Sequence, residues 1–215
     1  MPAFVYFDGQ VTRTLTAQAS NGADQTNYSF ASQSLGTETA SRFIVVAIVG
    51  GGAAAGRSVS SCSVGGVAAN ALVNANATNV AEMWVTPRVV DGGPTGTSGT
   101  VAVNFSGSMF NAIIAVYAID GASSTTPSST VSDTSAPLSS TLTIPAGGVG
   151  IAVAHASVTP GNTTWGGLTE DSDQGIEPRV GSTASLESIS GASPTVTVSW
   201  SAGVAEGFAA ASWGP

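Results

Sequence analysis

Residues 97–121 constrain the fold more than any other stretch of this sequence. From Val101 to Phe105 apolar and polar residues alternate, which is typical of a strand with one buried and one solvated face. Residues 112–119 form an unbroken apolar run rich in Ile, Val and Tyr, as expected of a central strand. The polar link over residues 106–111 is short enough for a turn. The stretch therefore predicts two antiparallel strands joined as a hairpin.

Two other apolar runs, residues 42–50 and 148–157, are similar to residues 111–121. No stretch shows the 3.6-residue period of a helix, so we expect strands throughout. Because these three runs are apolar without interruption, we expect them to be the central strands of two sheets. The alternation and the turn residues predict about a dozen short strands. They are residues 3–7, 11–17, 28–32, 42–49, 59–64, 80–86, 100–105, 112–119, 141–144, 148–158, 184–189, 195–200 and 207–213. The predicted fold is an all-β, antiparallel β-sandwich, jelly-roll-like or immunoglobulin-like.

The length of 215 residues fits one β-sandwich domain over residues 1–215. Within it, the Ser/Thr/Pro-rich residues 121–140 predict a long exposed loop. The polar residues 1–40 suggest an N-terminal arm that pairs with the sheet edge of a neighbouring subunit. The first residues lack a basic leader and an apolar core, so we expect no signal peptide and synthesis in the cytoplasm. The longest apolar run, residues 43–49, is too short to span a membrane.

The charge content is low and its balance is acidic. Charged residues make up 8% of the chain, the net charge is −8, and all five basic residues are arginines. Such a protein repels the phosphates of nucleic acid, so we expect no nucleic-acid partner. Abundant small polar residues give a weakly charged surface that another protein can cover at little cost in ionic desolvation. This composition is common in extracellular and virion β-proteins.

The residues that usually carry catalysis or bind metal are scarce. Cys62 is the only cysteine, which excludes an intrachain disulfide, and with no cation beside it we expect a half-buried, unreactive thiol. His155 is the only histidine, on a strand face with Ile151 and Val153, and the G-x-S-x-G pattern of a serine hydrolase is absent. One histidine and one cysteine do not build the usual zinc site. Paired-carboxylate catalysis stays open, since sequence does not give carboxylate separations. We predict a protein that is not an enzyme and has no cofactor.

Residues 51–58 match the phosphate-binding pattern G-x-x-x-x-G-K-[ST], except that Arg57 replaces the lysine. That site also needs a helix after the loop, so that its N-terminus faces the anion. Here the following residues predict a strand. We therefore favour a glycine-rich loop between strands, with nucleotide binding as the alternative.

Residues 170–177 hold the densest acidic cluster, formed by Glu170, Asp171, Asp173 and Glu177. Two aspartates flanking a serine, with a glycine behind them, resemble half of a calcium loop. The pattern departs from that of an EF-hand, and no helices flank it. We favour a solvated acidic loop, with a structural Ca²⁺ site as the alternative.

The tryptophans bear on sugar binding, which uses exposed aromatic faces. Trp200 shares a strand face with Val196 and Val198, which predicts a core position. Trp84 is ambiguous, and Trp165 lies in a turn-rich segment where it is expected to be exposed beside the acidic loop. A carbohydrate-binding module therefore stays open as a second class of function.

The order of the segments carries a resemblance. It runs through residues 42–50 (RFIVVAIVG), 58–70 (SVSSCSVGGVAAN), 81–87 (AEMWVTP), 95–107 (TGTSGTVAVNFSG), 112–121 (AIIAVYAIDG), 165–173 (WGGLTEDSD) and 209–215 (AAASWGP). Over residues 41–215 the chain resembles small β-sandwich proteins encoded among the structural genes of tailed bacteriophages. The resemblance implies a non-enzymatic virion component and brings no catalytic residues.

That family includes capsid decoration (cement) proteins and tail-associated adhesion domains. A compact domain with a polar arm, and no long repetitive shaft, favours decoration. The expected protein is then a homotrimer in the virion whose partner is the major capsid protein, with no nucleic-acid or membrane partner. The alternative is a tail-associated host-adhesion or carbohydrate-binding β-sandwich module.

Overall fold

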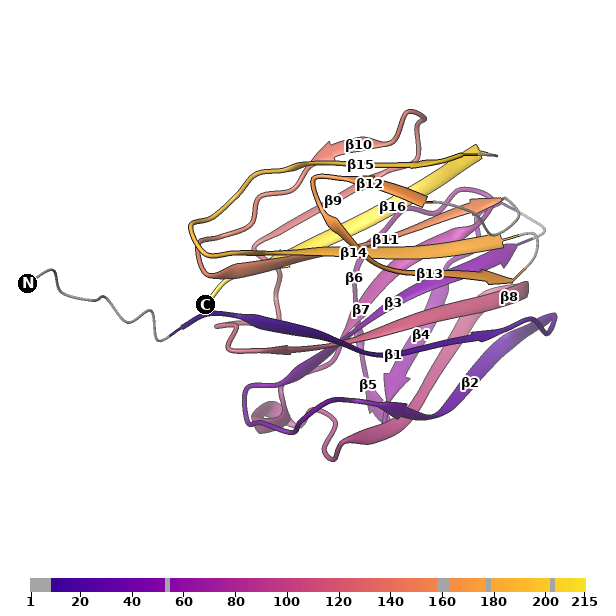
Figure 1. The fold of residues 1–215 in the computed structure, drawn as a ribbon. Coiled ribbons are helices and arrows are strands. Elements are labelled where there is room, and N and C mark those ends of the chain that lie inside the picture. Colours follow the sequence, from indigo (N-terminus) through magenta and orange to yellow (C-terminus); the bar gives the residue numbers. More distant parts are fainter. Residues whose placement is uncertain (1–8, 53–54, 158–162, 177–178, 202–203) are drawn as a thin grey trace, which may run out of the picture.

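The computed structural model describes residues 9–52, 55–157, 163–176, 179–201 and 204–215, and it shows an all-β, antiparallel fold (Figure 1). Sheet A contains β1 (Thr12–Asn21), β2 (Gln25–Ser34), β3 (Phe43–Gly52), β4 (Val59–Val64), β5 (Val67–Ala68), β6 (Asn70–Asn74), β7 (Val80–Val85) and β8 (Ser98–Asp120). Sheet B contains β9 (Ser129–Asp133), β11 (Gly148–Ser157), β13 (Thr169–Ile176), β14 (Arg179–Ser188) and β16 (Val204–Trp213). Sheet C contains β10 (Ser139–Thr141), β12 (Thr163–Gly166) and β15 (Thr195–Trp200). The predicted antiparallel β-sandwich is confirmed.

One short 3₁₀-helix, η1 (Val89–Asp91), interrupts this arrangement of strands. In the part of the chain that the structure describes, no helix has the length and apolarity needed to cross a bilayer.

The predicted hairpin over residues 97–121 is wrong, because this stretch is one continuous strand of 23 residues, β8. Its second half pairs with β3 on one side and β1 on the other, and its first half pairs with β4 and β2. Strands β1 and β2 therefore follow one another along one side of β8 as a single antiparallel neighbour, which is interrupted at residues 22–24. Strands β3 and β4 follow one another along the other side, with an interruption at residues 53–58. Both interruptions lie opposite residues 106–111, so the expected turn is a bend in β8.

Polar groups at this bend form hydrogen bonds with residues in the two interruptions of the neighbouring strands. The Ser108 hydroxyl donates a hydrogen bond to the Asp24 carboxylate, and Arg57 Nη1 donates to the Ser106 carbonyl oxygen at 3.4 Å. Gly107 leaves room for the guanidinium, because a Cβ built there falls 1.4 Å from Arg57 Nη1. The bend lets sheet A curl into a nearly closed barrel.

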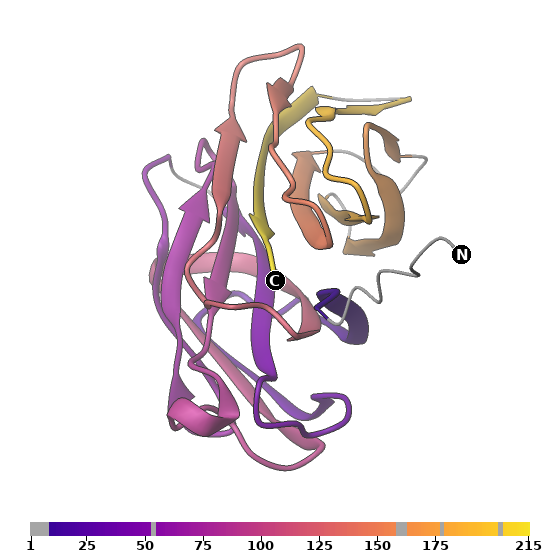
Figure 2. The same cartoon turned by 90° about the vertical axis from the view of Figure 1, so that its left-hand side faces the viewer.

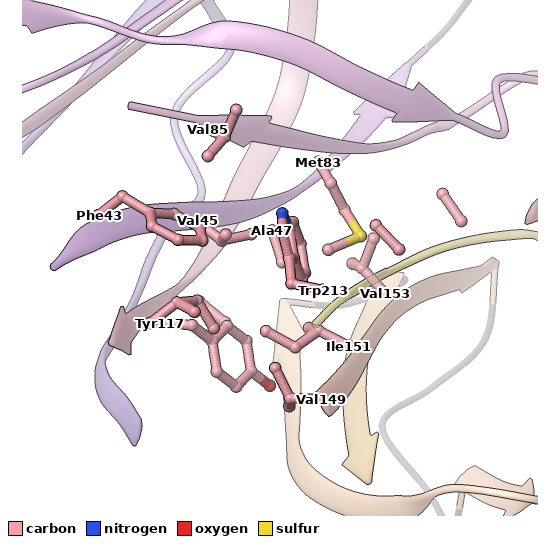
Figure 3. Packing of buried hydrophobic residues seen from close by; sticks show 14 of the residues in the cluster. Phe43, Val45, Ala47, Met83, Val85, Tyr117, Val149, Ile151, Val153 and Trp213 are labelled. Carbon is pink, nitrogen blue, oxygen red and sulfur yellow. The ribbon is translucent and has the colours of Figure 1, made fainter. Parts of the chain in front are cut away.

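Strand β3 is buried on both faces, which explains its unbroken apolar run. Ile44, Val46 and Ile48 point into the curled sheet A, where they join the first half of β8, β2 and β4. Phe43 and Val45 point the other way, toward sheet B. Figure 3 shows this second core, in which the Phe43 ring lies 5.9 Å from that of Trp213, between centroids.

Strand β11 is the equivalent strand of sheet B. Ile151 and Val153 pack toward sheet A, while Ala152 and Ala154 pack toward sheet C. The described chain is thus a stack, with one core inside sheet A, one between sheets A and B, and one between sheets B and C. Figure 2 shows the sheets side by side. The three apolar runs are central strands, as predicted.

Two segments differ from their predicted organisation. Residues 12–34 of the expected arm are strands β1 and β2, both paired with β8 of the same chain, and the expected strand at residues 3–7 lies outside the described residues. The expected loop over residues 121–140 contains β9, which pairs with β16. Strands β1 and β2 overlap the predicted strands at residues 11–17 and 28–32, but they pair within this chain and not with a neighbouring subunit.

Candidate functional site

A polar cluster lies between sheets A and B, where β3 and β11 end and β14 begins. Asn79, which is fully buried just before β7, forms its centre. Its Oδ1 accepts hydrogen bonds from the Gly52 main-chain N–H at 3.0 Å and from Arg179 Nε at 3.1 Å, and its Nδ2 donates to Ser157 Oγ at 2.9 Å. One amide thus ties three strands together.

His155 lies on β11 beside this cluster, on the face shared with Ile151 and Val153 that was predicted for it. It is fully buried, and burial lowers the pKa of its imidazole to about 4. The positive charge of Arg179 contributes to this lowering of the pKa, while a hydrogen bond to the Ala75 main chain opposes it. The imidazole is therefore neutral at pH 7 and sits inside the sandwich, which is a structural position.

Glu82 on β7 is the second buried polar centre. Its Oε1 accepts hydrogen bonds from the Val59 N–H at 2.9 Å and from Asn76 Nδ2 at 2.6 Å, and its Oε2 accepts one from Trp84 Nε1 at 2.9 Å. The carboxylate is only 4% exposed. Trp84 is buried in sheet A, so its indole offers no exposed face for a sugar.

The acidic residues 170–177 do not form the predicted loop, since residues 169–176 are strand β13 at the edge of sheet B. A bulge between Glu170 and Ser172 turns Asp171 toward sheet A. There its carboxylate forms a salt bridge with Arg13 at 3.3 Å and accepts a hydrogen bond from the Tyr117 hydroxyl at 2.9 Å. Burial and this carboxylate raise the pKa of Tyr117 well above its usual value.

The other carboxylates of β13 are engaged separately. Asp173 accepts a hydrogen bond from the Thr163 main-chain N–H at 3.2 Å, and burial followed by the charge of Asp173 raises the pKa of Glu170. Glu177 lies outside the described residues. Within the described ranges, no three His, Cys, Asp or Glu side chains are grouped to hold a metal ion. The strand gives the proposed calcium loop no support.

Sheet C carries the two remaining tryptophans of interest. Trp165 pairs with Val198, and together with Trp200 it packs against the core between sheets B and C. Its Nε1 donates to Ser182 Oγ at 2.8 Å. Trp165 is half-buried, whereas an exposed side chain was predicted. Trp200 is also half-buried, whereas a full core position was predicted. The two indoles face inward and do not form an exposed platform.

The glycine-rich residues 51–58 connect β3 to β4, and residues 53–54 lie outside the described part. Strand β4 follows the loop, as expected, so no helix N-terminus faces an anion there. Arg57 binds the β8 main chain. Cys62 on β4 is fully buried where half-burial was predicted, and burial raises the pKa of its thiol to about 12.

The sequence analysis missed Arg42, which is 1% exposed at the start of β3. Its guanidinium donates to the carbonyl oxygens of Gly36 at 3.2 Å, Gly96 at 2.9 Å and Pro94 at 2.6 Å. Burial lowers its pKa, and the charges of Glu38 and Asp120 oppose that shift. The only sequence signal was an arginine that directly precedes an apolar run.

Comparison of the sequence with protein-family models and with curated proteins finds no match.

Proposed function

We propose that this protein is a non-enzymatic structural component of a phage virion, and specifically a capsid decoration protein that binds and stabilises the assembled shell as a homotrimer. Its partner is the major capsid protein. The proposal rests on the resemblance of residues 41–215 to phage β-sandwich proteins. It also rests on the buried polar groups, which join segments of this chain to one another.

The observation that carries the proposal is that the buried polar groups described here hold the chain's own segments together. Arg42 fixes two loops, Glu82 fixes β4 against β7, and Asp171 joins sheet B to sheet A. His155 is kept neutral inside the core. This chemistry favours a rigid scaffold over a reacting site.

The surface favours a protein partner. At 8% charged residues with no lysine, a contact face loses little ionic hydration when another protein covers it. Binding only the assembled shell stabilises that shell by mass action, since opening the lattice then requires release of the bound copies.

The test is to purify particles that carry or lack this protein and to heat them or expose them to osmotic shock. We expect shells without it to release DNA at lower temperature, and addition of the pure protein to restore the original threshold. Equal resistance of both particles would refute stabilisation.

Gold-labelled antibody against the chain locates it on the particle. Label over the head supports decoration, whereas label at the tail supports the alternative of a tail-associated adhesion or carbohydrate-binding module. In that case a glycan array with Trp165→Ala as the control tests for sugar binding. Absence of label from every particle refutes both.

A further inference from the structure

Two hollows lie side by side where β1 begins. The larger, of about 440 Å³, is lined by Thr12, Ser41, Asp120 and Gly121, and the smaller, of about 130 Å³ and mostly apolar, by Ala146, Gly147, Ile189 and Pro215. Gly9 and Gln10 line both of them. Figure 1 shows the end of the last strand next to this start of β1.

This end of the molecule also carries exposed apolar side chains. Ile189, in the smaller hollow, is 71% exposed, and Val90 is 66% exposed. The Val90 N–H donates to the carbonyl oxygen of Ala40 at 3.0 Å, which places it next to Ser41 of the larger hollow. The two most exposed large hydrophobic side chains of the described residues therefore border the same region.

The residues that lead into this region are themselves apolar. Phe4, Val5, Tyr6 and Phe7 directly precede Asp8. They supply three of the ten Phe and Tyr residues in the sequence. Of the seven others, all of which the structure describes, only Phe110 is exposed. A chain that otherwise buries these rings thus carries three of them within five residues of Gly9, which lines the apolar hollow.

We propose that residues 4–7 of one copy place an aromatic ring in the smaller hollow of a second copy, so that copies of this chain associate through this end. A hollow of 130 Å³ is smaller than the roughly 300 Å³ or more of a small-molecule site. It is close to the roughly 150 Å³ cavity that holds a single benzene ring. The size therefore fits one side chain.

The geometry suits exchange between copies. The five residues from Phe4 to Asp8 reach about 17 Å when extended, at roughly 3.3 Å per residue. The donor segment precedes Gly9 closely in the sequence, and Gly9 lines the acceptor hollow, so cyclic symmetry lets every copy give and receive a ring.

The same chain is a poorer occupant, because Gly9 is itself a wall of the hollow. To enter the hollow of its own copy, a ring at residues 4–7 must turn back within the few residues that separate it from Gly9.

Variants with one added cysteine separate the two cases. The Ala3→Cys and Ile189→Cys proteins, which keep all three rings, are mixed under mild oxidation and run on a non-reducing gel, while the buried Cys62 stays unreactive. We expect a covalent heterodimer from this mixture, and none when Phe110→Cys, at the exposed bend of β8, replaces Ile189→Cys. An Ala3→Cys/Ile189→Cys double variant that closes only within one chain refutes the proposal, and so does the absence of any cross-link.

Sedimentation of the unlabelled protein gives an independent readout. Loss of one buried ring in a Phe4→Ser or Phe7→Ser variant is expected to weaken association on the order of 10- to 100-fold. The Val5→Ser variant is expected to weaken it less, because it removes no ring. A wild-type chain that stays monomeric refutes the proposal and contradicts a homotrimer of the isolated protein, whereas placement on the virion is decided separately by the particle experiments.

Discussion

Acidification should destabilise the protein through His155, since this imidazole is fully buried and its pKa in the folded state is about 4. In the unfolded chain the pKa of histidine is about 6.5. Between these values the unfolded state binds a proton that the folded state does not. The stabilisation from neutral His155 is therefore complete above about pH 6.5 and is lost as the pH falls toward 4.

The difference of about 2.5 pKa units sets the magnitude. At about 1.4 kcal/mol per unit, the free energy of unfolding falls by about 2 kcal/mol at pH 5 and by about 3 kcal/mol at pH 4 from this group alone. The positive charge of Arg179, which opposes protonation of the imidazole, is already part of this difference in pKa.

The assay is urea unfolding at pH 7 and at pH 5, for the wild type and for His155→Gln, which removes the titration. We expect the variant to be less stable at pH 7 but to lose about 2 kcal/mol less on acidification. Val153→Ala, on the same strand and buried, is the control, since it destabilises the core and keeps the histidine. An acid loss in His155→Gln equal to that of the wild type would refute the reasoning.

Three further predictions concern the framework. Gly148→Ala should lower the free energy of unfolding by more than about 2 kcal/mol, because the added Cβ falls 2.4 Å from a main-chain oxygen. Gly107→Ala should lower it by less than about 1 kcal/mol, since the added Cβ meets only the end of an arginine side chain, and urea unfolding compares the two variants. Arg42→Lys should lower the free energy of unfolding by about 2 kcal/mol through lost hydrogen bonds to carbonyl oxygens, and Arg88→Lys on the surface by less than about 0.5 kcal/mol; equal effects contradict the buried role. Cys62 should react with a thiol reagent at pH 8 only in denaturant, and rapid labelling of the folded protein would contradict its burial.

The central strands were predictable because their signal is local. The apolar run of β3 requires burial on both faces wherever it lies in the molecule. The bend of β8 was not predictable in the same way, because residues 106–111 have the composition of a turn. The neighbouring strands are interrupted within this span, but Met109 pairs with Gln25 on one side and with Gly52 on the other, which keeps β8 continuous.

The buried polar groups also depend on distant neighbours more than on the local sequence. The neutral, buried state of His155 depends on Arg179 and on the sheets that cover it, and its single position in the sequence gives no sign of either. Asp171 reads as part of an acidic surface segment, and only the bulge in β13 turns it toward Arg13. Arg42 was missed because its acceptors are main-chain oxygens, which leave no pattern in the sequence.

The single long strand β8 also sets an order of events during synthesis. Among the strands that the structure describes, β1 and β2 pair only with β8, yet the ribosome adds the last residue of β8 86 positions after the end of β2. At about 5–20 residues per second, this interval is on the order of ten seconds. Throughout it the nascent chain carries two strands whose edges have no partner and are open to pairing with other chains. Slower growth at lower temperature or chaperone binding to these two strands is thus expected to decide the soluble yield.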